Sequence, residues 1–499
     1  MFAIRPIACA SAVALLSAGS AHAALTAGQV WQAWKDGMAE AGATLSAATE
    51  SESGGTLTLN GITLSGEGTD TPLTISDMTL TEQADGSVLV RPGASIGLET
   101  QDEDVHVGVK LAHEGLTVVV RETGADGMAY DFAADRLNLV LDTSEASGSD
   151  EPESVAGTIS ADGLRGTWSD SGADARDIAL KMTAAKLGYD FAVADPSEAT
   201  KSVMSAAGDG FDVDFTVHLP AGFLPTGDDP ETAFPKALED GFALNLAVAQ
   251  GNWNSKMEIE SNETGKVAVT TEMQPASSLF RFDRDAFLLS SDYGGLAVNA
   301  NADAIPVPVN VTAESFSIKL QSPVVAVNQA ADYVALFRLA KLAVNDEVWG
   351  LLDPGGALKH EPLDLVIDLG GKLRIDLLGI ATAAEEGREP PVPSPQTLDI
   401  REITLKVAGA SLAADGAFTF DNTAGFPMPL GMANVIVTGA NQLVDGLVAI
   451  GLVPEDEAAG LMMMAGMFLK PGSEPDTMTS TIEAKEGGVV LVNGMQIMP

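Results

Sequence analysis

The sequence has almost no cysteine and few basic residues. Its one cysteine, Cys9, lies near the start, so no disulfide can form within the chain. Only 27 Lys and Arg stand against 70 Asp and Glu, and the formal net charge is −43. Because phosphate binding needs clustered Lys and Arg, this charge excludes nucleic acids and anionic membrane surfaces as partners. Hydrophobic residues make up 45% of the chain, which excludes a disordered acidic polymer.

The first 23 residues have the pattern of a secretory signal peptide. Arg5 supplies the positive charge, Ile7 to Leu16 form a short apolar stretch, and Ala21 and Ala23 are the small residues before a cleavage site. We therefore predict cleavage near Ala23 and export. An exported, acidic chain without disulfides fits a bacterial periplasm.

Long apolar runs are also missing after residue 23. The best candidate for a membrane span, Asn434 to Val453, contains Asn441, Gln442 and Asp445 near its middle. Charge at that depth is costly, so we predict no transmembrane segment once the signal is removed.

The remaining pattern predicts a mainly β fold with a few helices. Thr26 and Gln29 form a capping box for an N-terminal helix. From Thr56 onward apolar and polar residues mostly alternate, as in Val105 to Ala112 and Phe211 to Leu219, which indicates antiparallel strands with one buried face. We predict a long, twisted antiparallel meander or groove-like sheet, with helices at the N-terminus, in the middle and at the C-terminus.

Helical spacing predicts the later helices, and glycines predict the turns. The expected helices cover 329–342, 345–352, 442–452 and 455–469. Two final strands are expected at 477–484 and 489–497. Asn60-Gly61 suggests a tight turn or a bulge, and turns are expected at Asp162-Gly163, Asp240-Gly241 and Asp415-Gly416.

Composition suggests one boundary in the chain. Residues 24–384 form a β-rich region with the N-terminal helix and the central helical patch. Residues 385–397 are proline-rich and predict a loop or linker. Residues 398–499 form a C-terminal region of strands and a helical hairpin, which could also continue the preceding sheet.

Three segments resemble a known family. They are LTAGQVWQAWKDGMAEAG at the N-terminus, VNDEVWGLLDPGGALKH within Val344 to Ile375, and the tail from Gly425 to Gly494. These segments resemble secreted alphaproteobacterial proteins grouped as domain of unknown function (DUF) 2125, and their spread implies a resemblance close to full length. The family has no established activity, so the resemblance implies no catalytic residue. In style the chain is also similar to AsmA-like envelope proteins, whose long sheets form apolar grooves; this is an analogy of fold only.

Catalytic and metal-binding patterns are scarce. Gly93 to Gly97 matches G-x-S-x-G around Ser95, but no helix is expected after it, so a chance match is favoured over a hydrolase. The histidines after residue 23, which are His106, His113, His218 and His360, form no close pair. Asn299, Asn301 and Asp303 share a strand face but lack a calcium loop. We predict no enzyme activity, no cofactor and no metal.

Met462, Met463, Met464 and Met467 are concentrated in the last predicted helix. Methionine fills irregular gaps and also lines adaptable binding surfaces. These residues are expected either to pack the helix on the sheet or to line a groove for a ligand. Two hypotheses for the whole protein follow: a periplasmic protein that binds or moves a lipid or other hydrophobic ligand in a sheet groove, or a structural or interaction module of the cell envelope without a ligand.

Overall fold

The computed structural model describes residues 24–66, 72–101, 105–123, 127–145, 153–172, 174–195, 199–223, 230–263 and 265–498. The predicted signal peptide lies outside these residues. Strand makes up 63% of the structure and helix 14%, and the strands are antiparallel. The prediction of a mainly β, antiparallel fold with few helices is confirmed.

The chain divides into two compact units. The first unit covers residues up to 224 together with 255–265. Its sheet begins β1–β2–β3, continues through two short ladders, β4–β7 and β5–β6, and ends β8–β9–β10–β11–β13. Its elements are α1 (Ala27–Glu40), β1 (Ala43–Ser53), β2 (Thr56–Gly66), β3 (Leu73–Glu82), β4 (Val88–Pro92), β5 (Ser95–Gln101), β6 (Val105–Glu114), β7 (Thr117–Glu122), β8 (Met128–Glu145), β9 (Glu153–Ser171), β10 (Arg176–Asp195), β11 (Thr200–Leu219) and β13 (Trp253–Ser261).

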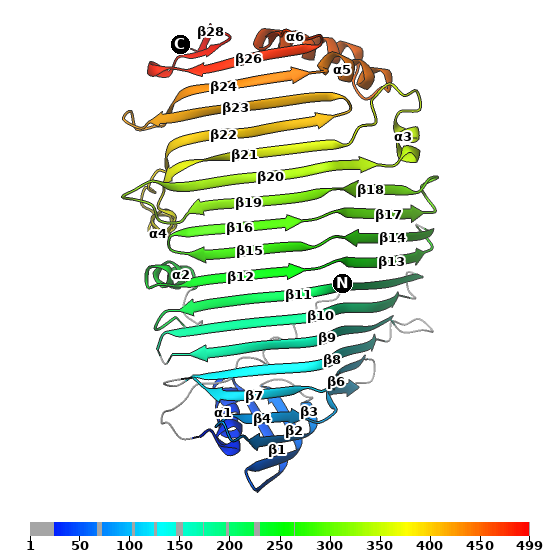
Figure 1. The fold of residues 1–499 in the computed structure, drawn as a ribbon, viewed down its shortest axis with the longest axis vertical. Coiled ribbons are helices and arrows are strands. Elements are labelled where there is room, and N and C mark those ends of the chain that lie inside the picture. Colours follow the sequence, from blue (N-terminus) through cyan, green and yellow to red (C-terminus); the bar gives the residue numbers. More distant parts are fainter. Residues whose placement is uncertain are drawn as a thin grey trace. The chain divides into compact units, whose positions relative to one another are not determined.

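The second unit covers 225–254 and 266–499. One ladder, β12–β15–β16–β19, and a second, β14–β17–β18, both end on the long strand β20 (Figure 1). From β20 the sheet continues β21–β22–β23–β24–β26–β27–β28. Its elements are α2 (Pro230–Glu239), β12 (Ala243–Gln250), β14 (Gly265–Met273), β15 (Ala276–Asp283), β16 (Ala286–Tyr293), β17 (Leu296–Ala302), β18 (Val309–Ala313), β19 (Ser315–Pro323), β20 (Ala331–Val344), α3 (Asp346–Leu352), β21 (Leu363–Arg374), α4 (Leu377–Glu385), β22 (Ser394–Val407), β23 (Ala410–Asp421), β24 (Met428–Thr438), α5 (Ala440–Ala449), α6 (Glu455–Phe468), β25 (Lys470–Pro471), β26 (Thr477–Ala484), a 3₁₀ turn (Glu486–Gly488), β27 (Val490–Val492) and β28 (Met495–Met498).

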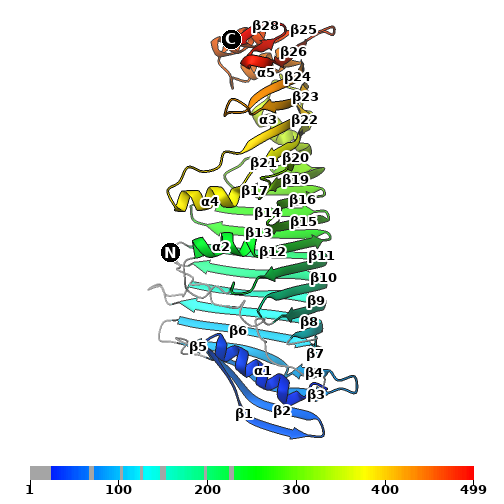
Figure 2. The same ribbon diagram turned by 90° about the vertical axis from the view of Figure 1, so that its left-hand side faces the viewer.

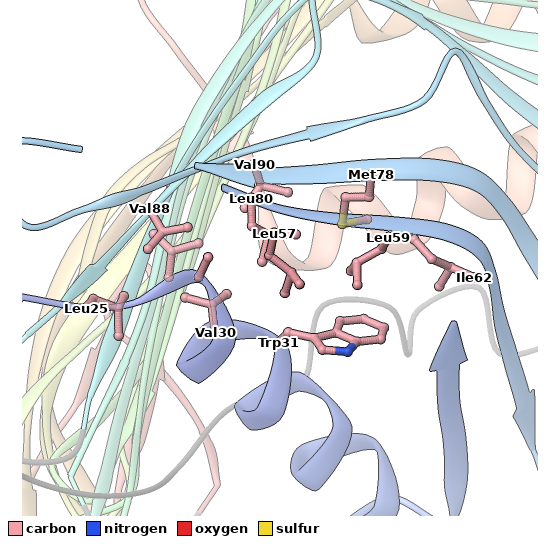
Figure 3. Close-up of a cluster of buried hydrophobic side chains, with 12 residues drawn as sticks. Leu25, Val30, Trp31, Leu57, Leu59, Ile62, Met78, Leu80, Val88 and Val90 are labelled. Carbon is pink, nitrogen blue, oxygen red and sulfur yellow. The ribbon is translucent and has the colours of Figure 1, made fainter. Parts of the chain in front are cut away.

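The N-terminal helix begins where the capping box predicts. The Thr26 side chain accepts from the backbone N–H of Gln29, and the Gln29 side chain accepts from the backbone N–H of Thr26. The helix then covers a small core between β2, β3, β4 and β7 (Figure 3). Trp31 is 2% exposed in this core, and its indole N–H donates to Glu50 Oε1 at 2.8 Å. The tryptophan therefore packs the helix on the sheet.

The long strands of the first unit are kinked at glycines. Gly163 in β9 and Gly210 in β11 have positive φ values of 63° and 62°, which lie in the left-handed region. In β8, which pairs with β9, the alternation of apolar and polar residues shifts by one position opposite Gly163. Phe132 lies before this shift and Leu137 after it, and both pack on the same buried cluster. A regular strand would put them on opposite faces, so the kink keeps the apolar residues on one face.

The glycine positions predicted from sequence have different outcomes: Asn60-Gly61 agrees with the predicted bulge, whereas two of the predicted turns lie inside strands. Asp162-Gly163 lies inside β9, Asp415-Gly416 lies inside β23, and Asn60-Gly61 is an irregularity within β2. Asp240-Gly241 follows the end of α2. A positive φ, as at Gly61 and Gly163, bends a strand as well as closing a hairpin, and cross-strand pairing decides which occurs.

The predicted helix over 329–342 is wrong. This segment forms β20, which pairs with β19 on one side and β21 on the other. Its run of apolar residues fits a helical period and also an alternation through Tyr333, Phe337 and Leu339. Its two neighbouring strands provide hydrogen-bond partners for its backbone N–H and C=O groups. Pairing with these strands therefore overrides the local helical pattern.

The C-terminal predictions agree better with the structure. Helices α3, α5 and α6 and strand β26 form where they are expected. The strand expected at 489–497 is a tight hairpin of β27 and β28, because Asn493 and Gly494 both have positive φ. Residues 386–393 connect α4 to β22, so the last four residues of the predicted proline-rich loop belong to the strand, and β21 pairs directly with β22.

Candidate ligand-binding face

One face of the second unit's sheet carries a continuous apolar row. Residues paired across neighbouring strands point to the same face, so the register defines the row. We call the side that carries it the apolar face. The row consists of Tyr293, Phe316, Leu339, Leu365, Leu405, Leu412, Val437 and Met478.

A second row runs beside the first on the same face. It includes Leu289, Leu320 and Ala335, which are cross-strand neighbours on β16, β19 and β20. Leu320 is 38% exposed. The apolar face is therefore more than one side chain wide.

The side chains of the main row are all partly exposed. The buried apolar residues of this sheet are mainly alanines such as Ala313, Ala410 and Ala433. A sheet with a second layer packed on it would bury its large side chains instead. Among the described residues, the row thus keeps apolar surface in contact with solvent.

Aromatic rings reinforce the row. The Phe316 ring lies 5.8 Å from Tyr293 and 5.3 Å from Phe337 between centroids, the second pair edge to face. Edge-to-face pairs fix the ring positions beyond simple burial. The aromatic side chains are therefore held in place along β16, β19 and β20.

Helices α2 and α4 lie on one side of this sheet (Figure 2). Phe234 of α2 is 39% exposed and stacks on Phe282 of β15, with 5.8 Å between ring centroids. Phe282 pairs with Phe287 of β16, which has the same orientation as Leu289 of the apolar face two residues later. Helix α2 therefore packs at the margin of the apolar face.

The opposite face is more polar. Arg401 donates to Asp368 at 3.1 Å, and Lys319, Arg338 and Glu402 project on the same side. We call this the polar face. It also carries a few exposed apolar residues, such as Ile436 at 48%. The two faces thus differ in chemistry while sharing the same strands.

The comparison with protein families covers this unit. Residues 244–493 match the family described as "Uncharacterized protein conserved in bacteria (DUF2125)". The chain belongs to the DUF2125 family. The N-terminal segment that also resembled the family lies outside the matched residues. No curated protein matches the sequence.

The four methionines proposed from sequence lie on α6 of the DUF2125 region. Met463 is 74% exposed, Met464 53% and Met467 58%, whereas Met462 is partly buried. Side chains this exposed do not pack on the sheet. The sequence pattern predicted the methionines as candidate ligand contacts. It did not predict the row on the sheet, because cross-strand neighbours are far apart in sequence.

The histidines lie apart from one another. His106 lines an open hollow of about 480 Å³ on the first unit, together with Lys110 and Asp142. His113 Nε2 lies 2.6 Å from the Gly93 carbonyl oxygen, and His218 Nδ1 lies 2.7 Å from Asp177 Oδ1. Within the described ranges, no three His, Cys, Asp or Glu side chains are grouped to hold a metal.

His360 belongs to a turn after α3. It stacks on Trp349 at 4.5 Å, and its Nε2 lies 3.4 Å from Asp353 Oδ2. Asp353 accepts from the backbone N–H of Leu358 and of Ala357, and these hydrogen bonds lower the pKa of its carboxyl. This arrangement closes the Asp-Pro-Gly-Gly turn.

Ser95, Asn299 and Asn301 lie on regular strands, and Asp303 directly follows one. Ser95 is the first residue of β5, which continues to Gln101, so the strand–turn–helix of a nucleophile elbow does not form there. Asn299 and Asn301 lie on β17, and Asp303 accepts from the backbone N–H of Lys266 at 2.9 Å. Asp303 therefore has a structural partner.

The first unit holds a partly buried ion pair and a largely buried tyrosine. Arg176 forms an ion pair with Asp170, whose residue is 5% exposed, and this hydrogen bond raises the pKa of Arg176. Burial raises the pKa of Tyr130 well above its usual range. Both groups lie among β8, β9 and β10, where they stabilise the fold.

No helix among the described residues is long and apolar enough to cross a membrane.

Proposed function

We propose that this DUF2125 protein binds the acyl chains of a lipid, or another elongated hydrophobic ligand, on the apolar face of its second unit. The observation that carries the proposal is the row from Tyr293 to Met478, which is apolar in every member and partly exposed throughout. Exposed contiguous apolar surface is unfavourable in water and is typical of a binding site.

The dimensions of the row suit a lipid. Eight strands at a spacing of about 4.8 Å give a row of about 34 Å. The hydrocarbon core of a bilayer is about 30 Å thick, and each leaflet contributes half of it. The row is therefore long enough for about two acyl chains end to end.

The proposal extends to location and to the kind of activity. The pattern of residues 1–23 supports export to a periplasm, where a lipid must cross water between membranes. We also propose that the protein acts by binding and not by catalysis. The alternative of a structural or interaction module without a ligand requires the same sheet face to be covered, and its partial exposure favours the ligand.

The test is extraction of the native protein. The protein is purified without detergent from the cells that produce it, extracted with organic solvent, and the extract is analysed by mass spectrometry. We expect near-stoichiometric phospholipid or fatty acid. An empty extract from folded, monomeric protein would overturn the proposal and favour the interaction module.

A further inference from the structure

Helix α6 exposes an unusual amount of apolar surface. From Ala458 to Leu469 the sequence, AAGLMMMAGMFL, contains no polar side chain. Met463 and Met467 are one helical turn apart, as are Met464 and Phe468, so they form two adjacent columns. Leu461 is 51% exposed and Phe468 48%, close to the values of the three methionines.

The helix is held at both ends and not along its outer side. It contacts α5, and Ala458 near its start is its buried residue. At its end, Asn493 donates to the Phe468 carbonyl oxygen at 2.8 Å, and the chain enters β25, which pairs with β26. The outer columns are therefore presented to solvent by a fixed helix.

The charge around α6 restricts what can cover it. The first turn carries Glu455, Asp456 and Glu457, and the helix contains no Lys or Arg. The whole chain has a net charge of −43. An anionic surface would be repelled, whereas the ammonium groups of zwitterionic headgroups would complement the three carboxylates.

We propose that α6 is a membrane-docking helix that lies in the headgroup region of a zwitterionic bilayer, with Leu461, Met463, Met464, Met467 and Phe468 toward the acyl chains. Fourteen residues span about 21 Å, which is too short to cross the hydrocarbon core, so a membrane-bound α6 would lie in the interface. The inference deepens the proposed function, on which it rests, because a protein that carries lipid must contact the membrane that supplies it.

The test is flotation of the full-length purified protein with vesicles. Phosphatidylcholine–phosphatidylethanolamine vesicles are compared with the same vesicles containing phosphatidylglycerol, for the wild type and for the triple variant Met463→Gln, Met464→Gln, Met467→Gln. Glutamine is similar in size to methionine and keeps a good helix propensity. The control, Met432→Gln with Ile436→Gln, removes exposed apolar side chains from the polar face of β24, where the two residues are 49% and 48% exposed. Circular dichroism checks that each variant is folded.

We expect the wild type and the control to float with zwitterionic vesicles, binding to fall at least about tenfold in the triple variant, and phosphatidylglycerol to weaken binding. Three results would each overturn the inference: no flotation of the wild type, unchanged flotation of the triple variant, or tighter binding to anionic vesicles. A wild-type dimer that the triple variant loses, without vesicle binding, would assign the surface to a second copy of the chain instead. Lipid found by extraction with no flotation would retain the proposed function and reject only this docking helix.

Discussion

Leu320 offers a direct test of the apolar face. It lies between Leu289 and Ala335 across neighbouring strands and is 38% exposed. In Leu320→Glu the free protein leaves the carboxylate in contact with water, so we expect a loss of stability of only about 1 kcal/mol. An acyl chain that covers this position would remove that water.

The magnitude follows from the cost of covering a charge. A charged side chain facing lipid costs about 2–3 kcal/mol, and each 1.4 kcal/mol is tenfold in affinity. We therefore expect Leu320→Glu to weaken binding of a fluorescent fatty acid by about 30- to 140-fold. The matched control is Ile436→Glu, since Ile436 is 48% exposed on the polar face. Its affinity should stay within about twofold of the wild type.

The pH dependence of binding gives a second test of whether the ligand covers Leu320. Burial under the ligand raises the pKa of the new carboxyl above its ordinary value of about 4.3. Relative to wild type, binding by Leu320→Glu should then be strongest at low pH and weaken as pH rises through that raised pKa, whereas the control should follow the pH dependence of wild type. The assay is a fluorescence titration between pH 4 and pH 8, alongside urea unfolding. Equal affinities for the two variants at pH 7 would refute the assignment of the apolar face.

Three further predictions concern stability. Gly163→Ala puts a Cβ at a φ of +63°, 3.1 Å from the Ala185 Cβ, so urea unfolding should show a loss of about 1–2 kcal/mol. Arg176→Met leaves Asp170 buried without its partner and should cost about 3 kcal/mol by the same method; an unchanged midpoint would contradict the role of this ion pair. Asp353→Asn should lower the melting temperature at pH 7, because the lowered pKa of Asp353 stabilises the fold above the ordinary carboxyl pKa. The difference from wild type should vanish as pH falls through the lowered value, which thermal melts at several pH values would detect.

Local sequence predicts where some helices begin. Thr26 and Gln29 predict the start of α1 because both partners of the capping box lie within one turn. The start of α6 at Glu455 is likewise marked by its acidic first turn. Helices α2 and α4 and strand β1 escaped prediction, since their short patterns become stable only against neighbours distant in sequence.

The candidate site lies beyond such local patterns. Alternation in β19 predicts that Phe316, Ile318 and Leu320 share a face, and it gives no information on which strands lie beside them. The row from Tyr293 to Met478 joins residues up to 185 positions apart only through the registers of seven strand pairs. The methionines of α6 were predictable as candidate ligand contacts because they are close together in the chain.

The sequence by itself determined the antiparallel β class and the strongly acidic net charge, because side-chain period and charge are local or summed properties. Only the tertiary structure decided that 331–344 is a strand, that glycines such as Gly163 bend strands, and that the apolar row from Tyr293 to Met478 stays partly exposed. Whether an apolar face is covered depends on which elements pack against it. That choice is made by contacts between distant segments, which no local pattern contains.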